Sequence, residues 1–277
     1  MTARDPEIKM HNLGGAKLRA AYWPAEIDTG KRPLVFFNGI GANLELVFKL
    51  GEVIRDRELI AFDAPGVGGS EETRFPYRPW QLCRWVKKLV GNYGVKEMDI
   101  MGVSWGGALA QQFAFQYRDS VKRVVLVATS TGMTMIPGRP EALSKMANPR
   151  RYSEPDYMRK NFETLYGDEL DSSGKAHTIA LQPPTARGYM YQMIAMLGWT
   201  SVPLLPFMQQ PILVMMGDRD RIVPLVNGKM ICKLAQNARL HVVENGGHLF
   251  LVTRADEVVP ELIAFLDEDA AEFRQAS

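Results

Sequence analysis

The sequence has little cysteine, no excess of charge and no long apolar run. Its two cysteines, Cys83 and Cys232, lie far apart, so the chain has neither a disulfide framework nor a Cys-x-x-Cys redox or metal motif. Lys and Arg number 33 against 31 Asp and Glu, a balance that excludes the strongly basic surface of a nucleic-acid-binding protein. No apolar stretch approaches the roughly 20 residues of a membrane span.

The first residues also lack the continuous apolar run of a secretory signal, because charged side chains interrupt them throughout. With two cysteines interpreted as free thiols, this predicts a cytoplasmic protein. Hydrophobic residues make up 46% of the 277 and charged residues 23%, the composition of a globular chain that can bury a large core. A disordered, collagen-like or coiled-coil chain is thereby excluded.

Short apolar runs of strand length alternate with helical patterns. The runs cover 33–37, 58–62, 98–103, 121–128, 211–216 and 240–243, and the helical patterns cover 43–54, 80–93, 105–117, 224–235 and 255–273. Continuous apolar runs are typical of strands that are buried on both faces. The alternation therefore predicts an α/β fold with a doubly wound, mostly parallel sheet between two layers of helices.

The alternation stops between residues 131 and 210, where prolines are frequent and no good strand occurs. A segment of about 80 residues is too long to be a structureless loop in a compact domain. We therefore predict a helical cap at 131–210, inserted into a core formed by 1–130 and 211–277. Ten of the 15 methionines fall between Met133 and Met216, where they either fill the core or line a pocket for flexible apolar ligands.

One motif carries a clear chemical prediction. Gly102-Val-Ser104-Trp-Gly106 directly follows the run 98–103 and opens the helical pattern 105–117. Gly-x-Ser-x-Gly at a strand-to-helix junction is the nucleophile elbow of α/β-hydrolases. A serine hydroxyl needs a base to take its proton and an acid to orient that base. Ser104 is thus the predicted nucleophile, and its partners are expected downstream, the acid before the histidine.

Both partners are expected in loops that follow later strands, where the carboxyl edge of the sheet assembles such sites. His248 follows the run 240–243 and is the predicted base. Asp220 follows the run 211–216 and is preferred as the acid over Asp218, which lies within the turn. Asp63 also follows a strand but precedes the serine, and is interpreted as part of a turn. The remaining histidines are interpreted as structural: His11, His177 and His241.

The negative charge of a tetrahedral intermediate requires two positioned N–H donors. Trp105, directly after the nucleophile, is the first predicted donor, and Ile40, in the loop after the run 33–37, is the second. Asn38, at the start of that loop, either braces it or contacts the acyl group. Three residues of the predicted cap are expected to contact substrate: Tyr189, Met193 and Trp199. This set of groups requires no metal or organic cofactor.

Several longer motifs together resemble one family. They include Asn38-Gly-Ile-Gly-Ala-Asn and its continuation to residue 48, the segments 61–70, 102–113, 197–201 and 247–254, and the cap segments 135–140 and 148–152. Over about residues 33–266 they closely resemble the intracellular depolymerases of medium-chain-length polyhydroxyalkanoates. The resemblance implies an α/β-hydrolase fold with Ser104, Asp220 and His248 as the catalytic residues. It further implies hydrolysis of stored polyester through an acyl-enzyme to 3-hydroxyacids or oligomers, at hydrophobic granules.

Two alternatives stay open. The same scaffold and triad also serve hydrolases of small esters, lactones or carbon–carbon bonds, because specificity lies in the cap. Outside enzymes, a ligand-binding protein can retain a hydrolase pocket. No oligomeric state is predicted.

Overall fold

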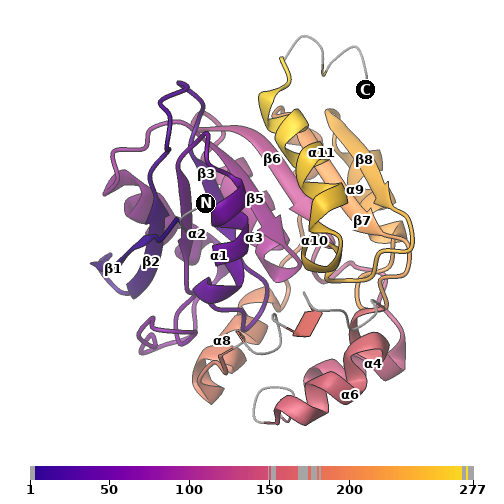
Figure 1. Ribbon diagram of the computed structural model, residues 1–277. Coiled ribbons are helices and arrows are strands. Elements are labelled where there is room, and N and C mark those ends of the chain that lie inside the picture. Colours follow the sequence, from indigo (N-terminus) through magenta and orange to yellow (C-terminus); the bar gives the residue numbers. More distant parts are fainter. Residues whose placement is uncertain are drawn as a thin grey trace.

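The computed structural model describes residues 4–148, 150, 154–167, 174–175, 180, 182–269 and 273. His177, and residues 149, 151 and 152 of one cap motif, lie outside this part of the chain. The described strands form one eight-stranded sheet in the order β1-β2-β4-β3-β5-β6-β7-β8 (Figure 1). Their bounds are β1 Glu7–Asn12, β2 Lys17–Trp23, β3 Leu34–Phe37, β4 Leu59–Phe62, β5 Met98–Val103, β6 Val121–Val127, β7 Ile212–Gly217 and β8 Ala238–Val243.

The predicted mostly parallel, doubly wound sheet is confirmed. From β4 to β8 all neighbouring strands run parallel. The chain moves from β3 to β4 on one side and then returns to β5 on the other, so the loops after β3 and β5 open at a topological switch point, where ligands bind in such sheets. Strands β1 and β2 were not predicted, and they form an antiparallel hairpin at one edge of the sheet.

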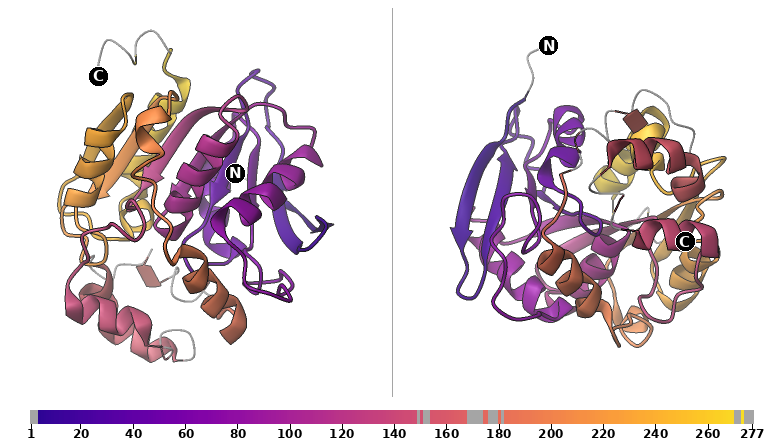
Figure 2. Two further views of the ribbon diagram at one scale, coloured as in Figure 1. Left: turned by 180° about the vertical axis from the view of Figure 1, so that it is seen from behind. Right: turned by 90° about the horizontal axis from the view of Figure 1, so that it is seen from below.

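Helices cover both faces of the sheet (Figure 2). On β3, Val35 and Phe37 pack with one apolar core and Leu34 and Phe36 with the other, as the alternation of a strand requires. The first core holds α2 Pro79–Gly91, α3 Trp105–Gln116 and α9 Val226–Leu234. The second holds the 3₁₀ helix η1 Leu44–Val47, the short α1 Phe48–Val53 and α11 Ala255–Asp267, which follows α10 Phe250–Thr253.

Two predicted helices differ from the observed ones. The pattern 43–54 is a 3₁₀ turn followed by one short α-helix, and α11 ends at Asp267 rather than near Phe273. Between β6 and β7 the chain forms α4 Pro140–Ala147, α6 Pro155–Tyr166, α8 Ala186–Met196 and the 3₁₀ helix η2 Leu205–Phe207. In Figure 1 the three α-helices lie below the sheet. At the carboxyl edge, Gly188 of α8 lies against Gly66 in the loop after β4. Gly138, just before α4, and Gly167, just after α6, lie against the loop after β7.

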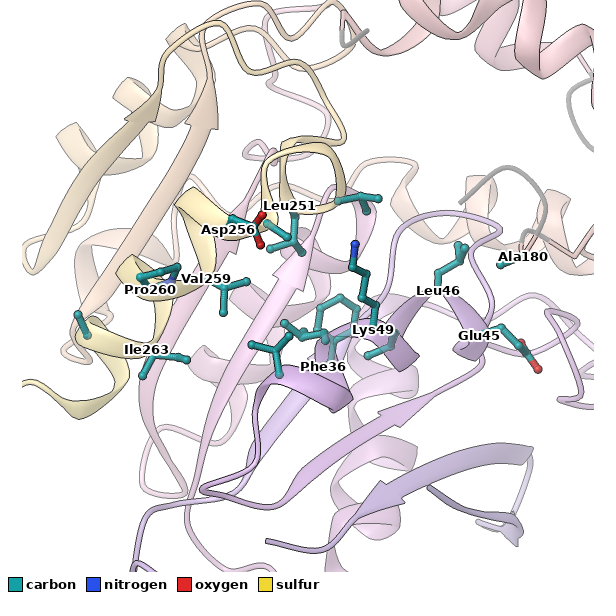
Figure 3. Close-up of a pocket in the computed structure, with 16 residues that line it drawn as sticks. Phe36, Glu45, Leu46, Lys49, Ala180, Leu251, Asp256, Val259, Pro260 and Ile263 are labelled. Atoms are coloured by element: carbon teal, nitrogen blue, oxygen red, sulfur yellow. The ribbon is translucent and has the colours of Figure 1, made fainter. Parts of the chain in front are cut away.

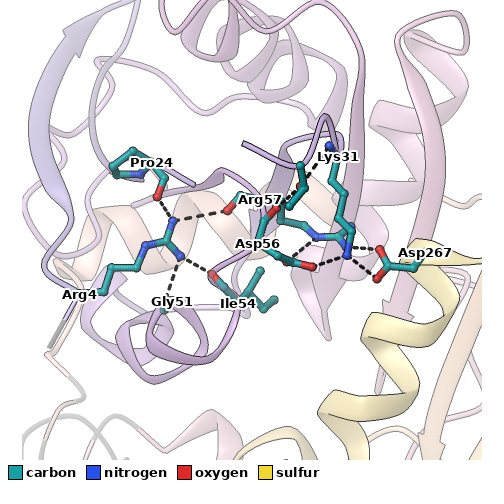
Figure 4. A network of polar contacts seen from close by, with 9 residues as sticks. Arg4, Pro24, Lys31, Gly51, Ile54, Asp56, Arg57 and Asp267 are labelled. Atoms are coloured by element: carbon teal, nitrogen blue, oxygen red, sulfur yellow. Dashed lines mark hydrogen bonds and ion pairs between the residues drawn. The ribbon is translucent and has the colours of Figure 1, made fainter. Parts of the chain in front are cut away.

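Polar contacts hold the ends of α1 and α11 (Figure 4). The Arg4 guanidinium donates to the carbonyl oxygens of Gly51 and Ile54 at the end of α1. At the end of α11, Asp267 accepts from Lys31 at 2.6 Å and from Arg57, which is 1% exposed. These contacts fix where both helices end on the second face of the sheet.

Within the described chain both cysteines are free, and no helix combines the length and apolar character of a membrane span.

Asp99 of β5 is a buried charge whose Oδ1 lies 2.9 Å from Nε of Arg32. Burial raises the pKa of Asp99 to about 6, although the Arg32 guanidinium acts in the opposite direction. Compared with the unfolded chain, the folded chain therefore shifts this carboxyl toward its protonated form.

We expect Asp99→Asn to change how stability depends on pH. In the wild type, protonated Asp99 contributes to the free energy of unfolding. This contribution is fully present below about pH 4 and is lost as the pH rises through the folded pKa of about 6. Asparagine stays neutral, so relative to wild type the free energy of unfolding of the variant should gain about 1–3 kcal/mol between about pH 4 and pH 7. Urea titrations at several pH values measure this free energy, and Asp119→Asn, a change at an exposed aspartate, is the control. A pH-independent difference would contradict the account.

Candidate active site

Ser104 lies at a sharp turn between β5 and α3. Its backbone has φ 54° and ψ −119°, a conformation that is strained for a residue with a Cβ. Two hydrogen bonds hold the turn: the Ser104 N–H donates to the Val127 carbonyl at 2.8 Å, and Thr129 Oγ1 donates to the Ser104 carbonyl at 2.6 Å. The serine side chain is thereby placed at the carboxyl edge of the sheet.

The glycines of the motif allow a close backbone approach. A Cβ on Gly106 would lie 2.0 Å from the Phe37 carbonyl oxygen and 2.5 Å from that of Asn38. A Cβ on Gly102 would lie 2.3 Å from the Gly106 carbonyl oxygen. Only glycine at both positions lets the first turn of α3 pack against the ends of β3 and β5. This packing brings Ser104 next to the loop that follows β3.

The loops after β7 and β8 are in direct backbone contact. A Cβ on Gly217 would lie 2.2 Å from the Gly246 carbonyl oxygen, which also accepts the Arg219 N–H at 2.9 Å. The Arg219 side chain donates to Oδ1 of Asn245, whose own backbone has a positive φ of 56°. The two loops therefore form one unit, which carries the predicted acid and base.

Within this unit the structure brings Asp220 and His248 together. Oδ2 of Asp220 lies 2.7 Å from Nδ1 of His248, and Oδ1 accepts the N–H groups of Ile222 and Val223 at 2.8 and 2.9 Å. Both side chains are buried, whereas Asp218 is exposed. The carboxylate is thus fixed on both oxygens, so it can orient the imidazole with Nδ1 as the donor and Nε2 as the base.

Tyr166, at the end of α6, lies against His248. The His248 N–H donates to the Tyr166 carbonyl at 2.5 Å, and the two rings are nearly parallel with centroids 6.4 Å apart. Gly167 then ends the helix with φ 79°, and a Cβ there would lie 2.2 Å from the Arg219 carbonyl oxygen. The segment between β6 and β7 therefore contacts both loops of the acid–base pair. No pattern in the sequence had singled out Tyr166.

Ser104 and His248 line the same cavity, which has a volume of about 100 Å³. The loop after β3 contributes Asn38, Gly39 and Ile40, so the predicted second oxyanion donor borders the same space. Tyr166 and Met146 close it from the segment between β6 and β7. Met146 belongs to the methionine-rich stretch, which was the one sequence signal for it.

The loop after β3 is braced from within. Asn38 Oδ1 accepts the Gly39 N–H at 3.0 Å, and Nδ2 donates to the Asn43 carbonyl at 2.9 Å. These bonds support a bracing role for Asn38, and its contact with the acyl group stays a prediction, since Asn38 also lines the cavity. Further along, Asp63 Oδ1 accepts the Leu44 N–H at 2.7 Å, so Asp63 supports this loop as well as its own turn. Burial raises the pKa of Asp63 to about 6 although Arg19 lies beside it.

Gln192 of α8 joins the two predicted oxyanion segments. Its Oε1 accepts the Gly41 N–H at 2.9 Å, and its carbonyl oxygen accepts Nε1 of Trp105 at 3.1 Å. The side chain is 1% exposed, and its Nε2 has no hydrogen-bond partner among the described residues. Gln192 was not predicted from the sequence, because its role depends on where α8 lies on the sheet.

Three predicted substrate contacts lie elsewhere. None of Tyr189, Met193 and Trp199 is among the residues that line the cavity of Ser104. Trp199 donates from Nε1 to Gln112 Oε1 at 2.8 Å and packs on Gly132, while Met193 is 53% exposed on α8. Their contact with a substrate stays a prediction.

The arrangement contains the groups needed for nucleophilic acyl transfer. A strained serine and a histidine whose Nδ1 lies against the Asp220 carboxylate border one cavity, and the start of α3 adds the positive end of a helix dipole. Among the described residues no three His, Cys, Asp or Glu side chains are grouped to hold a metal ion.

Comparisons with known proteins agree on the fold. A family profile for the alpha/beta hydrolase fold matches residues 32–173. The chain is 44% identical over 241 residues to a poly(3-hydroxyalkanoate) depolymerase of Ectopseudomonas oleovorans, which covers 86% of this chain and 85% of that protein. It is 27% identical to a 2-hydroxy-6-oxo-6-phenylhexa-2,4-dienoate hydrolase of Comamonas testosteroni, over 75% of this chain and 76% of that one.

Solved structures show the same fold at low sequence identity. An esterase from Exiguobacterium antarcticum superposes with a TM-score of 0.79 at 16% identity, covering 94% of this chain and 98% of the other. An enol-lactonase from Burkholderia xenovorans superposes with a TM-score of 0.75 at 20% identity, covering 94% of this chain and 100% of the other.

We expect Gln192→Leu to slow the reaction of Ser104 with a fluorophosphonate, whose phosphoryl oxygen occupies the oxyanion position. The change leaves the buried Gly41 N–H unpaired and frees the loop to shift, so the labelling rate should fall about 10-fold or more. Gln210→Leu is the matched control, because Gln210 is also buried but bonds the Ala114 carbonyl instead. Both variants should lose about 1–3 kcal/mol of unfolding free energy. Equal labelling rates in the two variants would refute the positioning role.

Proposed function

The chain belongs to the α/β-hydrolase family, and within it we propose a serine esterase that hydrolyses the ester bonds of poly(3-hydroxyalkanoate), of medium chain length and stored inside the cell. The likeness to a depolymerase of this polymer, at 44% identity over 86% of the chain, carries the choice of substrate. Support for the ester chemistry comes from Ser104 and the Asp220–His248 pair, which border one cavity.

The proposed reaction proceeds in two steps. His248 Nε2 accepts the Ser104 proton while Oγ attacks the ester carbonyl, and Asp220 stabilises the imidazolium that forms. The N–H groups of Ile40 and Trp105 stabilise the oxyanion. As the ester C–O bond breaks, His248 gives its proton to the leaving alkoxide. Water, activated by His248, then releases the 3-hydroxyacid or oligomer and restores Ser104. Side chains and backbone supply every group in this scheme, without a metal or organic cofactor.

We assign residues 131–210 to a cap that closes the site, inserted into a core of 1–130 and 211–277. Contacts of Tyr166 and Gln192 with the catalytic loops support this division. The outer side of α8 carries large exposed apolar side chains, Met190 at 49% and Met193 at 53%, followed by Leu197 at 61%. These three side chains form the cap rim that we propose to contact hydrophobic polymer granules in the cytoplasm, while Tyr189 and Trp199 remain proposed contacts for the bound substrate.

A carbon–carbon bond or lactone hydrolase is the second candidate. The 27% identity to a dienoate hydrolase over 75% of the chain favours it, because such enzymes use the same elbow serine and histidine. The two candidates differ in the substrate that must fit beneath the cap.

We expect Ser104→Ala to abolish ester hydrolysis, with kcat reduced about 10⁴-fold or more, because no other group replaces the attacking Oγ. The far-ultraviolet circular dichroism should stay that of the wild type, since alanine keeps the Cβ at this turn. Ser201→Ala, a change at another buried serine, serves as the control and should retain activity. Turnover that persists in Ser104→Ala would remove the basis of the proposed chemistry.

A substrate panel should separate the two candidate functions. We expect release of 3-hydroxyalkanoates from emulsified medium-chain-length polymer, measured by chromatography, at a rate that saturates with polymer surface. A 2-hydroxy-6-oxo-dienoate and simple lactones should be poor substrates on the same scale. If lactones or the dienoate are cleaved and the polymer stays intact, the depolymerase assignment fails.

A further inference from the structure

A large apolar groove lies beside the catalytic cavity. It has a volume of about 720 Å³ and runs between α1 and α11, with Phe36 of β3 at its floor (Figure 3). Val53 borders it from α1, and Val259 and Ile263 border it from α11. Nothing in the proposed chemistry uses this space.

The groove and the catalytic cavity share part of their walls. Phe36, Leu46, Leu251 and Val252 line both spaces. Leu251 and Val252 follow His248 by only a few residues, so the groove opens on the side where the base stands. The groove is therefore the space next to the catalytic cavity, and these four side chains lie at the boundary between the two.

The volumes show why a substrate needs the groove. Pockets for small molecules typically have about 300–1,000 Å³. The catalytic cavity, at about 100 Å³, holds one ester group and its nearest atoms, whereas the groove, at about 720 Å³, lies well within this range. A polymer continues on both sides of the bond that is cut, so at least one side must leave the small cavity.

The lining favours an uncharged, aliphatic occupant. Besides apolar side chains, the groove has charged groups at Glu45, Lys49 and Asp256. The Glu45 carboxylate is bound by Arg19 at 2.5 Å and by Asn43 at 2.6 Å. Asp256 is exposed in the first turn of α11, where a carboxylate stabilises the helix dipole. Phe36, Val259 and Ile263 give the walls an apolar surface. An alkyl chain that binds there is stabilised because its apolar surface leaves water.

Polar contacts fix the ends of the two helices that form the walls of the groove. Arg4 holds the end of α1 through the carbonyl groups of Gly51 and Ile54, and Arg57 with Lys31 holds Asp267 at the end of α11 (Figure 4). The walls are thus anchored without side chains that fill the space between them.

We propose that this groove is a binding subsite for the polyester segment next to the scissile ester, with alkyl side chains of the 3-hydroxyacyl units against α1 and α11. The proposal rests on the proposed function and names where a long substrate lies. It predicts that the groove distinguishes long esters from short ones, whereas the catalytic cavity does not.

Val53→Asp tests it, because Val53 lines the groove, is 49% exposed and is not among the residues that line the catalytic cavity. For nitrophenyl decanoate and for soluble 3-hydroxyoctanoate oligomers, we expect kcat/KM to fall about 10-fold or more, mainly through KM, since a carboxylate repels an alkyl chain. For nitrophenyl acetate kcat/KM should stay within about twofold, because this ester fits the cavity alone. Val226→Asp is the matched control, on α9 at 40% exposure and away from the groove, and should leave both substrates unchanged.

Ala264→Trp blocks the groove by bulk instead of charge and should give the same pattern. An equal loss for acetate and decanoate would show an effect on the catalytic loops and overturn the proposal. So would a loss confined to emulsified polymer with soluble oligomers unaffected, because that marks a docking surface. If wild type cleaves no polyester, the proposed function fails, whereas an equal response of nitrophenyl acetate and nitrophenyl decanoate overturns the subsite whether or not polyester is cleaved.

Discussion

The structure depends on one steric constraint, the close backbone approach of α3 to the ends of β3 and β5. Any side chain at Gly106 would collide with the Phe37 carbonyl, and any at Gly102 with the first turn of α3. The approach forces Ser104 into its strained turn and places it beside the loop after β3. It also points the positive end of α3 at the space where an ester carbonyl would gain charge. Strain in one residue is thereby offset by packing over a whole helix.

The parts of the fold that could be predicted are those set by local sequence. Strands β3 to β8 were predicted because most are apolar on both faces, and the positions of their ends alone placed Ser104, Asp220 and His248 at one edge of the sheet. Strand β1 was missed for the opposite reason. Almost every residue of β1 is exposed at the edge of the sheet, so Ile8 and Met10 give no core pattern that differs from a charged loop.

The remaining features depend on contacts between segments far apart in sequence. Tyr166 and Gln192 lie in helices whose position on the sheet is set by close backbone contacts, such as Gly188 against Gly66 after β4. Nothing near them in the sequence indicates which loop they meet. Trp199 stands in a distinctive motif that predicts a substrate contact, and this contact stays a prediction. Its sequence neighbours do not indicate that its ring packs on Gly132 or that its N–H donates to Gln112.

The groove between α1 and α11 follows from a balance of apolar and polar contacts. Closing these helices on each other would remove apolar surface from water and gain about 25 cal/mol for each Å² buried. The fold instead leaves Val53 half-exposed and anchors the helix ends through Arg4, Arg57 and Asp267. A buried guanidinium such as Arg57 stabilises a position only when its partner is in place, so it fixes geometry more than it adds stability. An apolar groove held in this way is expected where a ligand contributes apolar contacts to its walls.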